Sequence, residues 1–127
     1  MSQKTTVPAI GLDLDGTIDQ APEFFSHLSA CWQGDVHIIT YRSDRQGVIR
    51  DLERYCIKST HIHLVESFEA KAKIANVFQI LMMFDDMPEV LKSFDKGQNV
   101  CLIRNEGNYD FQNGRWQLSH KTGEIVQ

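Results

Sequence analysis

The segment AIGLDLDGT, residues 9–17, decides the fold prediction because it joins a short apolar run to an acidic turn. The run over residues 9–14 has the composition of a buried strand, and it carries Asp13 near its end with Asp15 directly after it. Gly16 permits a tight turn at this point. Pro22 then opens a stretch with apolar residues at helical spacing, namely Phe25, Leu28 and Trp32. The segment therefore predicts a strand, a tight turn and a helix.

The same alternation continues as far as residue 103. Four more apolar runs are typical of strands, and three segments between them have helical spacing and a suitable first residue. The runs cover residues 36–39, 62–65, 80–84 and 100–103, and the helices begin near Asp44, Ser67 and Pro88. This order predicts a three-layer, Rossmann-like α/β fold with a central parallel sheet and helices on both faces.

Three details of packing follow from the same patterns. The run 80–84 is apolar throughout, as expected for a strand buried on both faces. Val77 and Phe78 are expected in the core at the end of the third helix. Asn113 and Gly114 are the strongest short hairpin signal, so we expect a C-terminal β-hairpin whose flanking residues are Tyr109, Phe111, Trp116 and Leu118.

Length and composition limit the class of protein. The 127 residues suit a single domain, 1–127, and 42% hydrophobic with 24% charged residues is a globular profile. The net charge of -4 argues against a surface for duplex nucleic acid. Three cysteines without a metal pattern predict reduced, buried thiols. No apolar run approaches the ~18 residues of a membrane helix, and no signal peptide is evident, so we expect a cytoplasmic protein without membrane contact.

Polar residues follow three of the predicted strands where each strand ends. Asp13 and Asp15 belong to the first, Thr40 and Arg42 follow the second, and the pair Asp85–Asp86 follows the run 80–84. Carboxyl ends of parallel strands meet at one edge of the sheet, so four carboxylates, a hydroxyl and an arginine should share a rim. Neighbouring buried carboxylates need a cation among them, and Mg²⁺ prefers such oxygen ligands. These residues predict a magnesium site.

These motifs resemble the haloacid dehalogenase (HAD) superfamily. Residues 13–17, Asp-Leu-Asp-Gly-Thr, match its DxDGT signature, and Thr40 is similar to its second motif. The acidic pair Asp85–Asp86 is similar to its fourth motif, and a lysine at 71 or 73 to its third. The resemblance covers residues 9–103, with the motifs in family order. Asp15, a second aspartate two residues after Asp13, is similar to the phosphatase-like branch of the family. The segments between motifs leave no room for a cap domain, so the resemblance is to cap-less members of that branch.

The resemblance implies a function and a role for each residue. It implies an enzyme, a Mg²⁺-dependent phosphomonoesterase that hydrolyses a phosphate monoester through an aspartyl-phosphate. The implied catalytic residues are Asp13 as nucleophile and Asp15 as general acid and base. Thr40, Arg42 and Lys71 would bind the phosphoryl group or substrate. The implied metal ligands are Asp13, the Asp15 carbonyl, Asp85, and Asp86 directly or through water.

Several alternatives stay open at this stage. Lys73 competes with Lys71 as the phosphate-binding lysine, and Arg42 is equally suited to a surface position at a helix start. The implied substrate is a phosphorylated small molecule or a nucleotide. A nucleotide or polynucleotide-end phosphatase and a non-catalytic phosphate-binding regulatory module are the competing functions. The resemblance to cap-less members of the family implies an open site, and with it either large substrates or a homo-oligomer that covers the site.

Histidines supply one further motif outside these strand ends. His61 and His63 alternate in the run Thr60-His61-Ile62-His63-Leu64, so they share one face of a strand. A zinc site there needs further ligands, which the sequence does not identify.

Overall fold

The computed structural model describes residues 7–117 of the 127-residue chain. Its centre is a sheet of five parallel strands in the order β3-β2-β1-β4-β5. The strands are β1 (Ala9–Leu12), β2 (Val36–Thr40), β3 (His61–Leu64), β4 (Ile80–Asp85) and β5 (Asn99–Leu102). All five apolar runs therefore form strands of one parallel sheet, as predicted.

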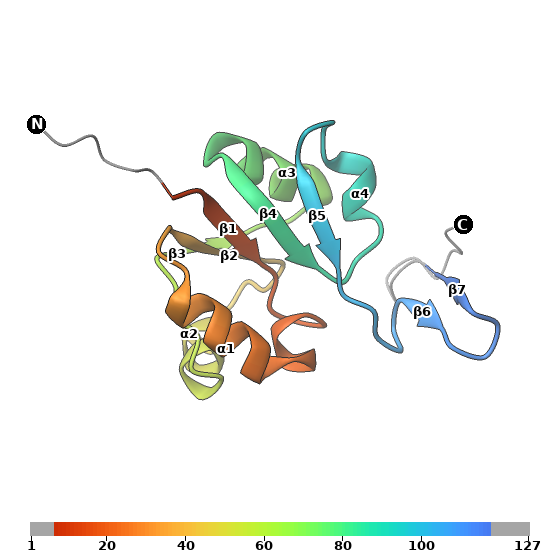
Figure 1. Ribbon diagram of the computed structural model, residues 1–127, viewed down its shortest axis with the longest axis horizontal. Helices are drawn as coiled ribbons and strands as arrows, with labels where there is room; N and C mark the ends of the chain where they lie inside the picture. Colours follow the sequence, from red (N-terminus) through yellow and green to blue (C-terminus); the bar gives the residue numbers. More distant parts are fainter. Residues whose placement is uncertain (1–6, 118–127) are drawn as a thin grey trace, which may run out of the picture.

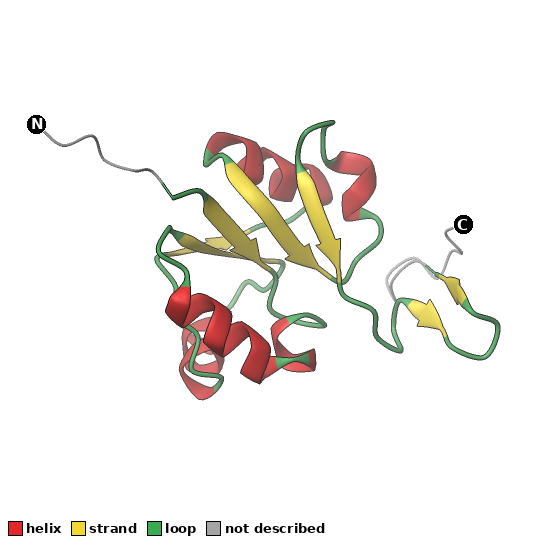
Figure 2. Cartoon of the chain, viewed as in Figure 1, coloured by secondary structure: helices red, strands yellow, loops and turns green. Residues whose placement is uncertain are grey.

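Helices cover both faces of the sheet (Figures 1 and 2). On one face lie α1 (Pro22–Cys31) and α2 (Arg45–Arg54), and on the other lie α3 (Phe68–Val77) and α4 (Val90–Ser93). A short 3₁₀ helix, η1 (Ile18–Gln20), connects β1 to α1. One core cluster includes Leu12, Phe25 and Leu52, and a second includes Ile39, Ala75 and Met83. This arrangement confirms the three-layer, Rossmann-like α/β prediction.

The predicted starts of α1, α2 and α3 are correct, although their caps differ, whereas α4 begins at Val90 rather than at Pro88. Ser67 caps α3 as expected, since its hydroxyl accepts a hydrogen bond of 3.0 Å from the Ala70 amide. Asp44 occupies the N-cap position of α2 but makes no side-chain capping bond. Its carboxylate lies 3.9 Å from the Arg50 guanidinium instead.

Two predictions about the core are wrong. Val77 is 61% exposed and Phe78 is 40% exposed, because both lie at the C-terminal end of α3, where the helix ends. Leu81 is 44% exposed although it lies within the apolar run 80–84. The register explains this: Ala9 pairs with Ile80 and Ile10 with Met82, so Leu81 is the extra residue of a β-bulge.

The cysteines match the prediction of free thiols but not the prediction that all of them are buried. The three cysteines are free thiols, as predicted, but Cys31 and Cys56 are exposed rather than buried. Cys31 is the last residue of α1, and Cys56 lies two residues after the end of α2.

The C-terminal hairpin is present as strands β6 (Tyr109–Asp110) and β7 (Arg115–Trp116), which pair antiparallel. Gly114 supplies the positive φ of +67° that the turn requires. The Tyr109 and Trp116 rings pack edge to face with centroids 5.1 Å apart. The hairpin follows β5 at the edge of the molecule (Figure 1). Leu118 lies outside the described residues. Within residues 7–117, no helix has both the length and the apolarity of a membrane span.

Candidate functional site

The site lies where the order of the strands reverses. From β1 the chain moves to β2 on one side and later returns to β4 on the other, so a crevice opens at the carboxyl ends of β1 and β4. Asp13 directly follows β1, and its amide donates a hydrogen bond of 2.9 Å to the Phe84 carbonyl of β4. Asp85 is the last residue of β4, and Asp86 follows it. The predicted convergence of these strand ends is therefore present.

Three carboxylates meet in this crevice, and we call Asp13, Asp85 and Asp86 the acidic cluster. One oxygen from each lies within 4.8 Å of the others. Asp85 is fully buried, and Asp13 is 3% exposed. Burial, followed by the charge of Asp85, raises the pKa of Asp13 well above its usual value. Burial also raises the pKa of Asp86. Ionisation of the acidic cluster is therefore costly unless a cation accompanies it.

Lys71 is the cation that the protein itself supplies. It projects from α3, is fully buried, and places its Nζ 2.7 Å from Asp85 Oδ2 and 3.3 Å from Asp13 Oδ1. Burial acts to lower the pKa of Lys71, but the charges of the two aspartates outweigh it and leave the pKa raised. Lys73, the alternative lysine, is exposed. Of the two candidates, the structure therefore brings Lys71 to the cluster.

The two residues of the acidic pair differ in how their oxygens are engaged. Asp85 uses both, since Oδ2 accepts from Lys71 and Oδ1 accepts a hydrogen bond of 2.9 Å from the Met87 amide. In Asp86, Oδ2 lies 3.3 Å from Asn105 Nδ2, while Oδ1 is buried without a hydrogen-bond partner among the described residues. Asp86 therefore has an oxygen left for a ligand that the protein does not provide.

Gly16 allows the turn after β1 to pass close to Asp86. Its φ is +80°, in the left-handed region, and a Cβ added there would lie 2.0 Å from Asp86 Oδ2. The amide of Gly16 donates to Asp19 Oδ1 over 2.8 Å, which holds the turn. A glycine at this position thus meets two requirements, a positive φ and room for a carboxylate.

Asp15 and Arg42 are paired with each other. Arg42 donates to both Asp15 oxygens, at 2.8 Å from Nε and 2.6 Å from Nη2, and its Nη1 donates to Asp51 over 2.6 Å. The hydrogen bonds to Asp15 and then to Asp51 raise the pKa of Arg42. In this arrangement Arg42 ties the turn after β1 to α2, and its predicted contact with a ligand would require it to leave these partners.

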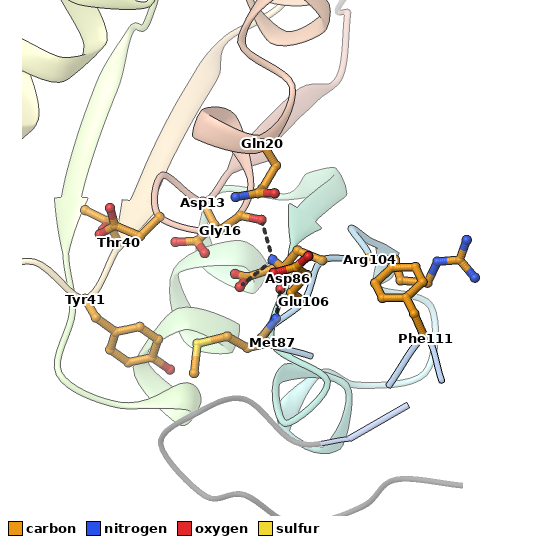
Figure 3. Close-up of a pocket in the computed structure, with 13 residues that line it drawn as sticks. Asp13, Gly16, Gln20, Thr40, Tyr41, Asp86, Met87, Arg104, Glu106 and Phe111 are labelled. Atoms are coloured by element: carbon orange, nitrogen blue, oxygen red, sulfur yellow. Dashed lines mark hydrogen bonds between the residues drawn. The ribbon is translucent and has the colours of Figure 1, made fainter. Parts of the chain in front are cut away.

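A cavity of about 810 Å³ opens above the acidic cluster (Figure 3). Thr40 and Tyr41, at the end of β2, form one side, and Arg104 and Phe111, after β5, form the other, with Asp13 and Asp86 between them. The Arg104 guanidinium lies 5.1 Å from the centre of the Phe111 ring. Of the predicted site residues, Asp13, Asp15, Thr40 and Asp86 line this cavity.

Two asparagines of the site were not predicted. Asn105 Nδ2 donates to the Gly16 carbonyl over 2.9 Å, in addition to its contact with Asp86. Asn108 is fully buried, and its Nδ2 donates to the carbonyls of Asp86 and Ile103. Both follow the apolar run 100–103, so the reasoning applied to the other strand ends would have pointed to them. They fix the segment after β5 against the acidic cluster.

Comparison with known proteins assigns the chain to no family. No family model and no curated protein match it. A solved structure of a universal stress protein from Archaeoglobus fulgidus matches with a TM-score of 0.46 and 8% identity, over 78% of this chain and 95% of that chain. At this level the likeness carries nothing about function.

The comparisons overturn the resemblance to the HAD superfamily. No family model and no curated protein that matches the chain supports it. The prediction of a phosphomonoesterase that acts through an aspartyl-phosphate depended on that resemblance and is wrong with it. The family motifs are short, and Asp, Gly and Thr are common at tight turns after strands. That the chain is an enzyme stays a prediction.

Proposed function

We propose that this site binds Mg²⁺ and, through Mg²⁺, the phosphoryl group of a small molecule such as a nucleotide. The observation that carries the proposal is the acidic cluster, in which oxygens from two strand ends lie within 4.8 Å. Asp86 Oδ1 adds to it, because a buried carboxylate oxygen without a hydrogen-bond partner costs free energy that a bound cation removes.

Charge balance favours a divalent cation. When ionised, the three carboxylates carry three negative charges, and Lys71 contributes one positive charge, which leaves two negative charges in a buried crevice. Uncompensated buried charge is strongly unfavourable. A divalent ion would neutralise the difference, and hard oxygen ligands favour Mg²⁺ over softer metals.

The engagement of each oxygen indicates which carboxylates would be direct ligands. Asp13 and Asp86 line the cavity and retain oxygens that can face an ion, whereas both oxygens of Asp85 are committed to Lys71 and Met87. Neighbouring oxygens around an octahedral Mg²⁺ lie about 3.0 Å apart, which small side-chain adjustments of the acidic cluster reach. Asp85 would then act by holding Lys71, and water would complete the shell.

The cavity suits an anion only after a cation is bound. Its wall carries Asp13, Asp86 and Glu106 against Arg104, while Asp15 is paired with Arg42, so its potential without the ion opposes a phosphate group. With Mg²⁺ present, the phosphoryl oxygens could join its shell, and the buried Thr40 could donate its hydroxyl to them. Tyr41 and Phe111 offer apolar surface for the rest of the molecule.

Isothermal titration with MgCl₂ tests the cation site. We expect one Mg²⁺ per chain, a loss of at least tenfold in affinity for Asp86→Asn, and unchanged affinity for Asp95→Asn, which removes an exposed carboxylate elsewhere. Equal affinity in Asp86→Asn and the unmodified chain would reject the site.

A second titration tests the phosphoryl group. Inorganic phosphate and adenosine monophosphate should each bind in the presence of MgCl₂ and not with EDTA. Broadening of their ³¹P NMR lines measures this binding. Thr40→Val should weaken this binding while leaving the Mg²⁺ affinity unchanged. Binding that is independent of Mg²⁺ would contradict the proposed role of the cation.

A further inference from the structure

A second group of side chains that can bind a metal lies at the opposite end of the parallel strands. Asp35 precedes β2, His37 is its second residue, and His61 is the first residue of β3. One potential ligand atom from each lies within 4.8 Å of the others. We call these three residues the histidine cluster. It lies at the amino ends of β2 and β3, whereas the acidic cluster lies at the carboxyl ends of β1 and β4.

Strand register brings these side chains together. His37 pairs with His61 across the two parallel strands, and their rings stack with centroids 4.4 Å apart. Asp35 lies two residues before His37 and therefore on the same face, with Oδ2 3.8 Å from His61 Nε2. The missing ligands for His61 are thus on the neighbouring strand, which the sequence alone could not indicate.

His63 holds the ring of His37 in place. The His37 Nδ1 and His63 Nε2 atoms lie 2.9 Å apart, a hydrogen-bond distance, so the Nε2 atom of His37 is left as its ligand atom. Metal-binding histidines commonly use their second nitrogen in this way. Burial, followed by the charges of His61 and His63, lowers the pKa of His37 to about 4.

We propose that Asp35, His37 and His61 bind a divalent transition-metal ion of the Zn²⁺ class, and that His63 positions His37 through their hydrogen bond. Two imidazoles and one carboxylate are a borderline ligand set that suits Zn²⁺ and leaves a fourth position for water. Ligand atoms around tetrahedral Zn²⁺ lie about 3.3 Å apart, close to the 3.8 Å between Asp35 and His61.

Access and adjustment are compatible with this geometry. The His61 and Asp35 side chains are 46% and 60% exposed, so an ion can enter from solvent while His37 lies buried behind it. Stacked imidazoles aim their nitrogens in parallel, so His61 must turn its ring toward the ion, and its exposure gives it the room. Phe78, whose ring centroid lies 4.9 Å from that of His37, flanks the rings.

The alternative is that the three imidazoles only stack as aromatic groups, and titration of the full chain with CoCl₂ and ZnCl₂ distinguishes the two. MgCl₂ is kept in excess to occupy the acidic cluster. We expect one Co²⁺ per chain with the visible bands of a four-coordinate ion, displaced by one equivalent of Zn²⁺. The Asp86→Asn variant should behave identically, which separates this site from the proposed Mg²⁺ site.

Matched variants identify the ligands. His61→Phe keeps a stacked ring but removes a ligand, and we expect at least a 100-fold loss of Zn²⁺ affinity; Asp35→Asn, a small change at an exposed carboxylate, should lose at least tenfold. His63→Phe should lose about 10- to 100-fold, as expected for a positioning residue. His27→Phe, at an exposed histidine on α1, should change nothing. Zn²⁺ affinity that is unchanged in both His61→Phe and Asp35→Asn would overturn the proposal.

Discussion

The two ends of the parallel strands carry clusters of different chemistry, although β2 contributes residues near both ends. His37 and Thr40 are three residues apart on β2, about 10 Å along the strand. The acidic cluster gathers carboxylates around one buried lysine, whereas the histidine cluster holds two stacked imidazoles, and His63 contacts one of them, His37, at hydrogen-bond distance. Only the acidic cluster should therefore depend on an internal ion pair.

The largest effect on stability is expected at Lys71. Lys71→Met leaves Asp13 and Asp85 without their buried counter-charge, so we expect a loss of about 3–5 kcal/mol in the free energy of unfolding, measured by urea denaturation with EDTA. Lys73→Met, two residues away and exposed, should change it by less than about 0.5 kcal/mol. Similar stabilities for the two variants would show that the ion pair does not hold the acidic cluster together.

The next effect concerns the space beside Asp86. Gly16→Ala combines a positive φ with a Cβ 2.0 Å from the carboxylate, while Gly97→Ala has a positive φ of +99° and nothing within 4 Å. We expect Gly16→Ala to lose about 2 kcal/mol more than Gly97→Ala, and to weaken Mg²⁺ binding, which Gly97→Ala should not. Equal losses would assign the whole cost to backbone conformation.

Acid should act on the histidine cluster. The pKa of His37 is about 4 in the folded state against 6.5 when unfolded, so the unfolded chain binds more protons between these values. Stability should therefore be full above pH 6.5 and fall as the pH drops toward 4, by on the order of 1–2 kcal/mol between pH 7 and 5. The charges of His61 and His63 also lower this pKa, whereas the charge of Asp35 raises it.

The measurement is the difference in unfolding free energy between the unmodified chain and His37→Phe, with EDTA, at pH 7 and pH 5. Taking this difference cancels the contribution of the acidic cluster, whose raised pKa values favour the folded state at lower pH. His27→Phe should follow the unmodified chain. A difference that does not change with pH would remove His37 as the acid-sensitive group.

The smallest effect is expected at the rim of the cavity. Asn105→Ala removes the hydrogen bonds to the Gly16 carbonyl and to Asp86, so we expect a loss of about 1 kcal/mol and a several-fold weaker Mg²⁺ affinity. Asn99→Ala removes a comparable bond, to the Leu81 carbonyl, away from the site. It should lose a similar stability without any change in Mg²⁺ affinity, and a parallel loss of affinity would contradict the role of Asn105.

Sequence patterns predicted the parts of the molecule that depend on chain order. Apolar runs separated by helical segments were enough for the parallel sheet, and acids after two of those runs were enough to bring Asp13 near Asp85. The bulge at Leu81 could not be predicted, because a continuous apolar run is compatible with either register. The helical pattern could not decide whether Lys71 or Lys73 lies in the site. That choice depends on which side of the helix packs against the rest of the protein, and the pattern alone does not determine this.

The histidine cluster shows the same limit at a functional level. His61 and His63 were visible as an alternating pair, but their partners His37 and Asp35 lie more than twenty residues earlier in the chain. Only the register of β2 against β3 places them together. The sequence failed to reveal the histidine cluster, but its short acidic motif suggested too much. An acidic turn after a strand indicated a family that the comparisons do not support.

Crystals grown with MnCl₂ in place of Mg²⁺, and with ZnCl₂, would reveal both proposed metal sites, because anomalous scattering locates each metal separately. We expect a manganese peak between Asp13 and Asp86, with oxygen distances of about 2.1–2.2 Å. We also expect a zinc peak between His37 and His61, with nitrogen distances of about 2.0–2.1 Å. Saturating manganese without a peak at the acidic cluster would rule out a cation site there.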